Sequence, residues 1–441
     1  MWLDSARVEV PPLDSNDPRE FLDELSISDP AFDAWLRIER GRRQTAARGF
    51  TRLEGVASPL RRPVLYFLKD APSDPAVAMI SAMFTDALAR TISEHFTVDI
   101  SETTSRRVVS QGSGDLIFLT ETVFQPRLAA FRVALCAGSR RRVWSGHRVA
   151  STGSDADMLE NDGIQRLVNE AVEAYADAVL TDRHEPHDRL NASVLARTAL
   201  RQIFTMRPNL YGGADDLLER AYYLDPRGVY LAWRTLLRVV RLVERHEGDG
   251  GVAAAEAIAL SRQALDLEPL NSLVLAAASN VASLIERNAP AALELAQRSA
   301  RRNPANPFAW DALSTSALHV GKLEEAYVFA VKAQRLAGDT PFKHWYDMGR
   351  ALMATVTGRL DEALQLAGAA SVMPHFKPPL RYIAALYAHA GNEEQARLAV
   401  ERLTALEKDF SAERLVEDPD YPVDGLRRSQ ILHQGLFGIL H

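Results

Sequence analysis

Small residues recur at nearly constant spacing through the second half of the chain. An Ala is followed by a Pro twelve residues later at Ala214/Pro226, Ala257/Pro269 and Ala292/Pro304, and the Ala positions continue at Ala326, Ala363 and Ala396. Consecutive members of this Ala series are 43, 35, 34, 37 and 33 residues apart. A second small residue lies seven places after each of the first five, at Ala221, Ala264, Ser299, Ala333 and Ala370. Such positions let two helices cross closely, so the pattern predicts stacked helix pairs over residues 190–410.

Gly residues at a fixed distance from the Ala series indicate where helices end. Gly321, Gly358 and Gly391 each lie five residues before an Ala of the series, where a Gly can end the preceding helix. The spacing is close to the roughly 34-residue period of tetratricopeptide repeats (TPR), which stack into a solenoid with a concave groove. We therefore expect an all-α solenoid of this type that binds a protein partner. The apolar tail in 411–441 predicts a capping segment, with partner binding as the alternative.

The first half of the chain alternates between strand-like and helix-like patterns. Short apolar runs predict strands at 64–68, 97–100, 116–124, 130–135 and 143–149, and helical periodicity covers 75–96 and 157–180. One sheet with packed helices, an α+β domain over 61–182, is the economical arrangement because each half-apolar element must bury its face. Residues 1–60 are interpreted as a helical connector, and 181–191 as a polar linker.

Composition and charge narrow the class of protein. The 441 residues carry a formal net charge of 51 − 58 = −7, which provides no general attraction to nucleic acid or anionic lipid. Cys136, the single cysteine, lies in an apolar run and is expected to be structural. No stretch is expected to span a membrane, and the start lacks a signal-peptide pattern, so we expect a cytoplasmic protein. Only six of the basic residues are Lys, a bias that we associate with GC-rich bacterial genomes.

Several segments resemble a known bacterial arrangement. They are the stretches that begin at Met79, Asp115, Phe131 and Arg142, and they resemble the TolB-amino-terminal-like α/β domain. This domain precedes tetratricopeptide repeats in bacterial SARP-related transcriptional regulators and in some adenylate/guanylate cyclases. The stretch from Phe21 to Arg40 resembles the connector that follows a winged-helix DNA-binding domain in those regulators. The stretch that begins at Gly425 resembles the C-terminal segment of the same regulators.

The resemblance implies a regulatory protein without catalytic residues. Neither the winged helix nor a cyclase catalytic domain has a counterpart in this sequence, so we expect a non-enzymatic adaptor that lacks both output domains. A regulator that contacts DNA itself is the first alternative, and a truncated relative of an adenylate cyclase is a weaker one. Homo-oligomer formation stays possible.

Motifs for catalysis, cofactors or metals were not found. Gly112 to Gly114 lacks the Lys of a phosphate-binding loop and is interpreted as a turn. His184 and His187 flank Pro186, which disfavours the helix that a paired-His metal motif needs, so no metal site is expected. Arg140 to Arg142 are expected at a solvated hairpin tip, with contact to an acidic partner as the alternative.

Partner-binding residues are predicted on the inner face of the first helix of each pair. The candidates are Phe308, Asp311, Thr315, His319, Trp345, Arg381 and His389. Asp311 and Arg381 are expected as exposed groove charges, which would contribute to specificity rather than to folding. The matching face from Val274 to Leu284 is unusually apolar. It fits either a partner helix in the groove or closure of the superhelix on itself.

Overall fold

The computed structural model describes residues 64–69, 74–103, 116–125, 128–137, 141–151, 160–181, 188–245 and 250–432. They all belong to one compact unit, Arg61–His441. The predicted connector 1–60, the turn at Gly112, the pair His184 and His187, Arg140 and the end of the apolar tail lie outside the described residues.

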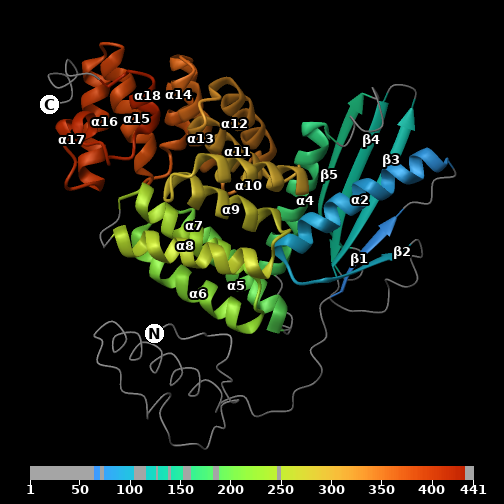
Figure 1. Ribbon diagram of the computed structural model, residues 1–441. Coiled ribbons are helices and arrows are strands. Elements are labelled where there is room, and N and C mark those ends of the chain that lie inside the picture. Colours follow the sequence, from blue (N-terminus) through green and yellow to red (C-terminus); the bar gives the residue numbers. More distant parts are fainter. Residues whose placement is uncertain are drawn as a thin grey trace, which may run out of the picture. The chain divides into compact units, whose positions relative to one another are not determined.

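A five-stranded sheet forms the first part of this unit (Figure 1). Its strands are β1 (Val64–Lys69), β2 (Asp99–Thr103), β3 (Leu116–Gln125), β4 (Leu128–Ala137) and β5 (Arg141–Ser151), in the order β2-β1-β3-β4-β5. β1 pairs in parallel with β2 and β3, whereas β3, β4 and β5 form antiparallel pairs. All five predicted strands are present, with ends shifted by up to three residues.

Two helices cover one face of the sheet. α2 (Pro75–His95) contacts β3, and α4 (Asp162–Thr181) contacts β4, β5 and α2. α2 begins where the sequence dictates, because the Asp74 side chain accepts a hydrogen bond from the N–H of Ala76 and Pro75 occupies the first turn. By length and composition alone, α2 is the one described helix that could cross a membrane, whereas the sequence was expected to contain no such stretch. Ile80, Phe84 and Leu88 of α2 are buried in the core of the sheet domain.

Antiparallel helix pairs make up the rest of the described chain. The first helices of the pairs are α5 (Asp188–Ile203), α7 (Gly228–Val243), α9 (Ser272–Leu284), α11 (Pro307–His319), α13 (Lys343–Val356) and α15 (Lys377–His389). The second helices are α6 (Tyr211–Leu224, after the short 3₁₀ turn η3, Pro208–Leu210), α8 (Gly250–Leu267), α10 (Ala289–Arg302), α12 (Leu323–Ala337), α14 (Leu360–Ala370) and α16 (Glu393–Leu406). Two short helices, α17 (Ala412–Glu417) and α18 (Asp424–Arg428), follow. α5 begins inside the predicted linker 181–191, since the helical pattern resumes directly after Pro186.

The Ala series lies at the crossing of each helix pair. All six members, from Ala214 to Ala396, are completely buried on the second helices. Gly321 ends the hairpin helix α11 with a φ of 81°, and the N–H of Lys322 donates to the carbonyl of Ala317 over 2.9 Å. This positive φ is the conformation that favours Gly after a helix. The described residues therefore form a mainly helical protein, in which a small sheet domain precedes a helical repeat region.

Candidate functional site: the inner face of the repeats

The first helices of the pairs pack against one another, with α7 on α9 and α9 on α11. In α9 every residue from Ser272 to Ser283 is buried, whereas α8 buries only Ala257, Ser261 and Ala264. A helix that is buried on all sides has no face left for solvent. The inner face of the repeats is therefore filled by the chain itself around α9.

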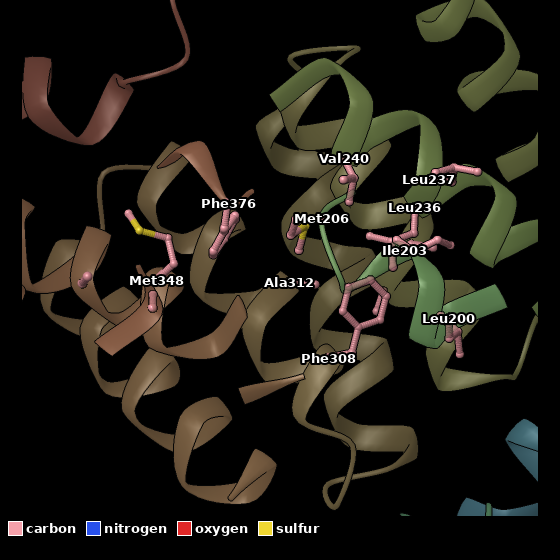
Figure 2. Close-up of a cluster of buried hydrophobic side chains, with 14 of the residues drawn as sticks. Leu200, Ile203, Met206, Leu236, Leu237, Val240, Phe308, Ala312, Met348 and Phe376 are labelled. Carbon is pink, nitrogen blue, oxygen red and sulfur yellow. The ribbon is translucent and has the colours of Figure 1, made fainter. Parts of the chain in front are cut away.

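Side chains from distant repeats form this filling (Figure 2). Leu200 and Met206 of the first repeat, Val240 of α7, Phe308 of α11 and Phe376 before α15 belong to one buried cluster. Val274 and Ala277 on the apolar face of α9 belong to the same cluster. Of the two interpretations of that face, closure of the superhelix on itself is the one observed.

Three of the seven predicted partner-binding residues are buried. Phe308, Asp311 and Arg381 have exposed fractions of 4%, 7% and 0%. The expectation that Asp311 and Arg381 form exposed groove charges was wrong, because side chains from other repeats occupy the space that an open groove would leave to solvent. Thr315, His319 and Trp345 are half-buried, and His389 is exposed. Partner binding by these four residues stays a prediction.

Asp311, Trp345 and His319 have partners within the chain. The indole Nε1 of Trp345 donates to Oδ2 of Asp311 over 2.9 Å. Burial raises the pKa of Asp311 to about 6, and the hydrogen bond from Trp345 partly opposes this effect. The Nδ1 of His319 shares a hydrogen bond with the hydroxyl of Ser283 on α9. Burial and the nearby Arg428 lower the pKa of His319.

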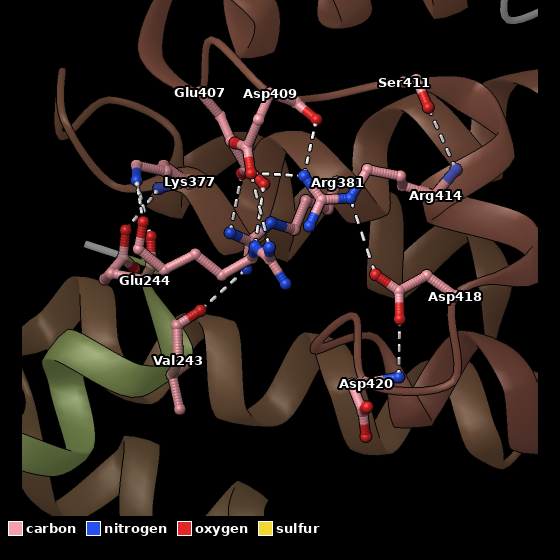
Figure 3. A network of polar contacts seen from close by, with 11 residues as sticks. Val243, Glu244, Lys377, Arg381, Glu407, Asp409, Ser411, Arg414, Asp418 and Asp420 are labelled. Carbon is pink, nitrogen blue, oxygen red and sulfur yellow. Dashed lines mark hydrogen bonds and ion pairs between the residues drawn. The ribbon is translucent and has the colours of Figure 1, made fainter. Parts of the chain in front are cut away.

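Arg381 is the centre of a charged group that joins the first repeats to the last (Figure 3). We call Val243, Glu244, Lys377, Arg381 and Glu407 the closure network. The Nη1 of Arg381 donates to the carbonyl of Val243 at the end of α7 over 2.9 Å. Its Nη2 donates to Oε2 of Glu407, after α16, over 2.8 Å. The side chains of Arg381 and Glu407 are 0% and 1% exposed, so neither charge is compensated by water.

Lys377 and Glu244 complete the closure network. The Nζ of Lys377 donates to the carbonyl of Glu244 over 2.6 Å, and its backbone N–H donates to Oε2 of Glu244 over 3.2 Å. Burial raises the pKa of Glu244 to about 7, although Arg381 and Lys377 favour its charged form. Burial also lowers the pKa of Lys377. These residues are far apart in the chain, and their contacts hold α7 against α15.

The sheet domain is fixed to the repeats through the last turn of α2, at Glu94. One oxygen of the Glu94 carboxylate accepts a hydrogen bond from the N–H of Ser272 over 3.0 Å, at the start of α9. The other accepts from the Ser272 hydroxyl and from Nδ2 of Asn303, both over 2.6 Å. A carboxylate is favourable at this position because it meets the positive end of the α9 dipole.

Turns from three successive repeats meet the same end of α2. Arg227 donates to the carbonyls of Ser93 and Glu94 over 2.8 and 3.3 Å, and Nδ2 of Asn271 donates to the carbonyl of Glu94 over 3.1 Å. Sequence reasoning missed this joint. The available signal was a polar residue beside two of the three Pro residues of the repeat pattern, namely Arg227 after Pro226 and Asn303 before Pro304.

A small cavity lies where α2 and α4 meet the inner helices. Its free volume is about 40 Å³, which suffices for a few water molecules. His95, Glu173, Arg197, Trp233 and Phe308 are among its lining residues. The side chain of Arg197 is 3% exposed and forms an ion pair with Glu173. Burial and the adjacent Arg197 and Arg227 hold the pKa of His95 well below its usual range, so this imidazole is neutral.

Other candidate chemistry is limited in the described residues. They contain no group of three or more His, Cys, Asp or Glu side chains that could hold a metal ion. Cys136 is buried on β4. In the segment after α16, Tyr421, Val423 and Leu426 are buried against the repeat core. This segment therefore uses its described apolar residues for packing.

Comparisons with known proteins find similarity only to solved structures. No protein-family model matches the chain, and no curated protein matches it. YrrB, a TPR protein with an unusual peptide-binding site, is 18% identical, with a TM-score of 0.28 over 44% of this chain and 93% of YrrB. TTC0263, a thermophilic TPR protein of Thermus thermophilus, is 18% identical, with a TM-score of 0.32 over 40% of this chain and 91% of its own. The pilF protein of Pseudomonas aeruginosa is 15% identical, with a TM-score of 0.33 over 51% of this chain and 96% of its own.

Proposed function

We propose that this chain is a non-enzymatic bacterial regulatory adaptor that binds a protein partner in the cytoplasm. The observation that carries the proposal is the Glu94 joint together with the filled inner face. Three repeats hold the end of α2. The sheet domain and the repeats thus present one rigid outer surface, and rigid surfaces lose little conformational entropy when they bind.

Binding is proposed on the outside of the repeats and of the sheet domain. Phe308, Asp311 and Arg381 are excluded as contact residues because the chain itself covers them. His389, which is exposed at the end of α15, and the half-buried Thr315, His319 and Trp345 stay candidates. The regulatory role rests on the resemblance of the sheet domain to the TolB-amino-terminal-like domain. The assignment to bacteria rests on that resemblance and on the low share of Lys among the basic residues.

The test is purification of the tagged full chain from its own host, followed by mass spectrometry of what co-elutes. A partner that re-forms a complex of fixed stoichiometry from two recombinant proteins, with a dissociation constant measurable by calorimetry, is the expected result. If no such protein is found, the adaptor proposal fails. If the chain instead binds defined DNA fragments selectively, the alternative of a DNA-contacting regulator replaces it.

A further inference from the structure

A cleft opens on the outside of the protein between α2, α4 and the turn that connects α10 to α11. Its free volume is about 220 Å³. The apolar lining residues are Met83, Phe84 and Ala87 of α2, Ile164 and Val168 of α4, and Pro304 and Ala305 of the turn. Apolar cavities of about 150 Å³ accept a benzene ring, so this outer cleft is large enough for one Leu, Met or Phe side chain.

The turn that forms one wall is held in place by hydrogen bonds. The Thr91 hydroxyl donates to Oδ1 of Asn303 over 3.3 Å, while Nδ2 of Asn303 donates to Glu94. The N–H of Ala305 donates back to Oδ1 of Asn303 over 3.2 Å. Ala305 is 4% exposed and packs in the core of the sheet domain. The outer cleft is therefore preformed and does not depend on a ligand for its shape.

Exposed apolar side chains continue from the outer cleft along α2. Met79 and Met83, one helical turn apart, are 53% and 44% exposed. Met side chains adapt to differently shaped partners and are common on surfaces that bind peptides. An apolar patch of this kind beside a preformed cleft is typical of an interaction surface.

Positive charge borders the same place. Arg90 of α2 lines the cleft, and Arg298, Arg301 and Arg302 lie on α10. All four are exposed, and the described residues form no ion pair with them. The Nη1 of Arg90 donates to the carbonyl of Arg302 over 3.3 Å, which places the end of α10 at the rim of the cleft. Arg359, an arginine at the start of α14, is by contrast paired with Glu324 over 2.9 Å. One acid, Asp86, also lines the cleft.

We propose that the outer cleft binds a short acidic peptide segment of a protein partner, with one Leu, Met or Phe side chain in the cleft. Carboxylates next to this anchor would meet Arg90 and the arginines of α10, whose planar guanidinium groups suit carboxylates in two-pronged contact. The inference rests on the proposed adaptor function and names its surface and the chemistry of its partner.

The experiment selects peptides from a random phage-displayed library on the full-length protein and measures the selected peptides by fluorescence anisotropy. We expect them to share an apolar anchor flanked by Asp or Glu and to bind more weakly as salt concentration rises. Ala87→Phe, which fills the cleft, and Arg302→Glu, which reverses a rim charge, should each weaken binding at least about tenfold. Arg397→Glu, a charge reversal at an exposed position on α16, should leave the affinity unchanged.

Several outcomes would overturn the inference. The inference fails if the selected peptides lack acidic residues. It also fails if Arg302→Glu binds the selected peptides with the same affinity as the wild type. If Ala87→Phe fails to fold, Met83→Asp and Arg302→Glu, both at exposed positions, still decide the question. Binding of single-stranded RNA that Arg302→Glu abolishes and a folded Ala87→Phe leaves intact would assign the arginines to phosphate contacts instead. If a purified partner binds Ala87→Phe and Arg302→Glu as tightly as the wild type, the cleft is not the binding site, but the proposed adaptor function still holds.

Discussion

Arg381→Met tests the closure network by removing its central charge while keeping an unbranched, though shorter, side chain. The substitution deletes the hydrogen bonds to Glu407 over 2.8 Å and to the carbonyl of Val243 over 2.9 Å. It also leaves the carboxylate of Glu407, which is 1% exposed, with Arg245 as its remaining cation, 3.5 Å away. Removing one partner of a buried ion pair costs about 3–5 kcal/mol, because the remaining charge is neither paired nor hydrated. Because Arg245 still pairs with Glu407 over 3.5 Å, we expect a loss in the free energy of unfolding near the lower end of this range.

Urea unfolding of the full chain, followed by circular dichroism and by tryptophan fluorescence, measures this loss. Arg397→Met on α16 is the matched control, since Arg397 is 65% exposed and lies 4.0 Å from Glu401, and it should cost about 1 kcal/mol or less. Adding Glu407→Gln to Arg381→Met should restore part of the stability, because the buried carboxylate that lost its bond to Arg381 is then absent. A loss for Arg381→Met no larger than that of Arg397→Met would refute the reasoning.

Three further predictions concern packing, pH and DNA. Ala326→Leu places a larger side chain at a completely buried helix crossing and should cost about 1–3 kcal/mol in a urea melt; an unchanged midpoint would mean that the Ala series is misassigned. The pKa of Glu244 is raised from 4.5 to about 7 in the folded state, so the folded protein binds this proton more tightly than the unfolded chain does. The protonated carboxyl therefore adds its full contribution to stability below pH 4.5, and this contribution is lost as the pH rises through 7. Glu244→Gln should therefore flatten the pH profile of stability by about 3 kcal/mol, and parallel profiles would contradict this. With a net charge of −7 the chain should bind labelled genomic DNA fragments weakly and without preference in fluorescence anisotropy at about 0.15 M salt, and tight, selective binding would count against the adaptor.

Local features of the fold follow from the sequence more directly than its long-range contacts. The Ala series marks the helix crossings because only small side chains fit there, and Asp74 with Pro75 sets the start of α2. Periodicity also places Asp311 and Arg381 on the inner face. It does not determine how tightly the repeats wind, since that depends on a small rotation added at every repeat. Asp311 is bonded to Trp345 of the next repeat, and Arg381 is bonded to Glu407 of its own repeat and to Val243 of a distant one.

The joint at Glu94 had no such local signal. Glu94 and Ser272 are 178 residues apart, and their hydrogen bonds depend on how the sheet domain meets the repeats. The charged pattern around Arg381 is likewise spread over α7, α15 and the turn after α16. From the sequence, Arg381 is an ordinary surface arginine, because the pairing partner that permits its burial is set by the fold.

Cross-linking across the closure tests most directly whether the chain fills its own inner face. The Nη2 of Arg245, after α7, lies 3.4 Å from Oδ2 of Asp409, after α16, and these residues are 164 positions apart. In a Cys136→Ala background, Arg245→Cys combined with Asp409→Cys should form an intramolecular cross-link with a short bifunctional maleimide, and the same protein unfolded in urea should not. If the folded protein gives no cross-link, the repeats are open, their inner face is free for a partner, and the account of a closed superhelix is contradicted.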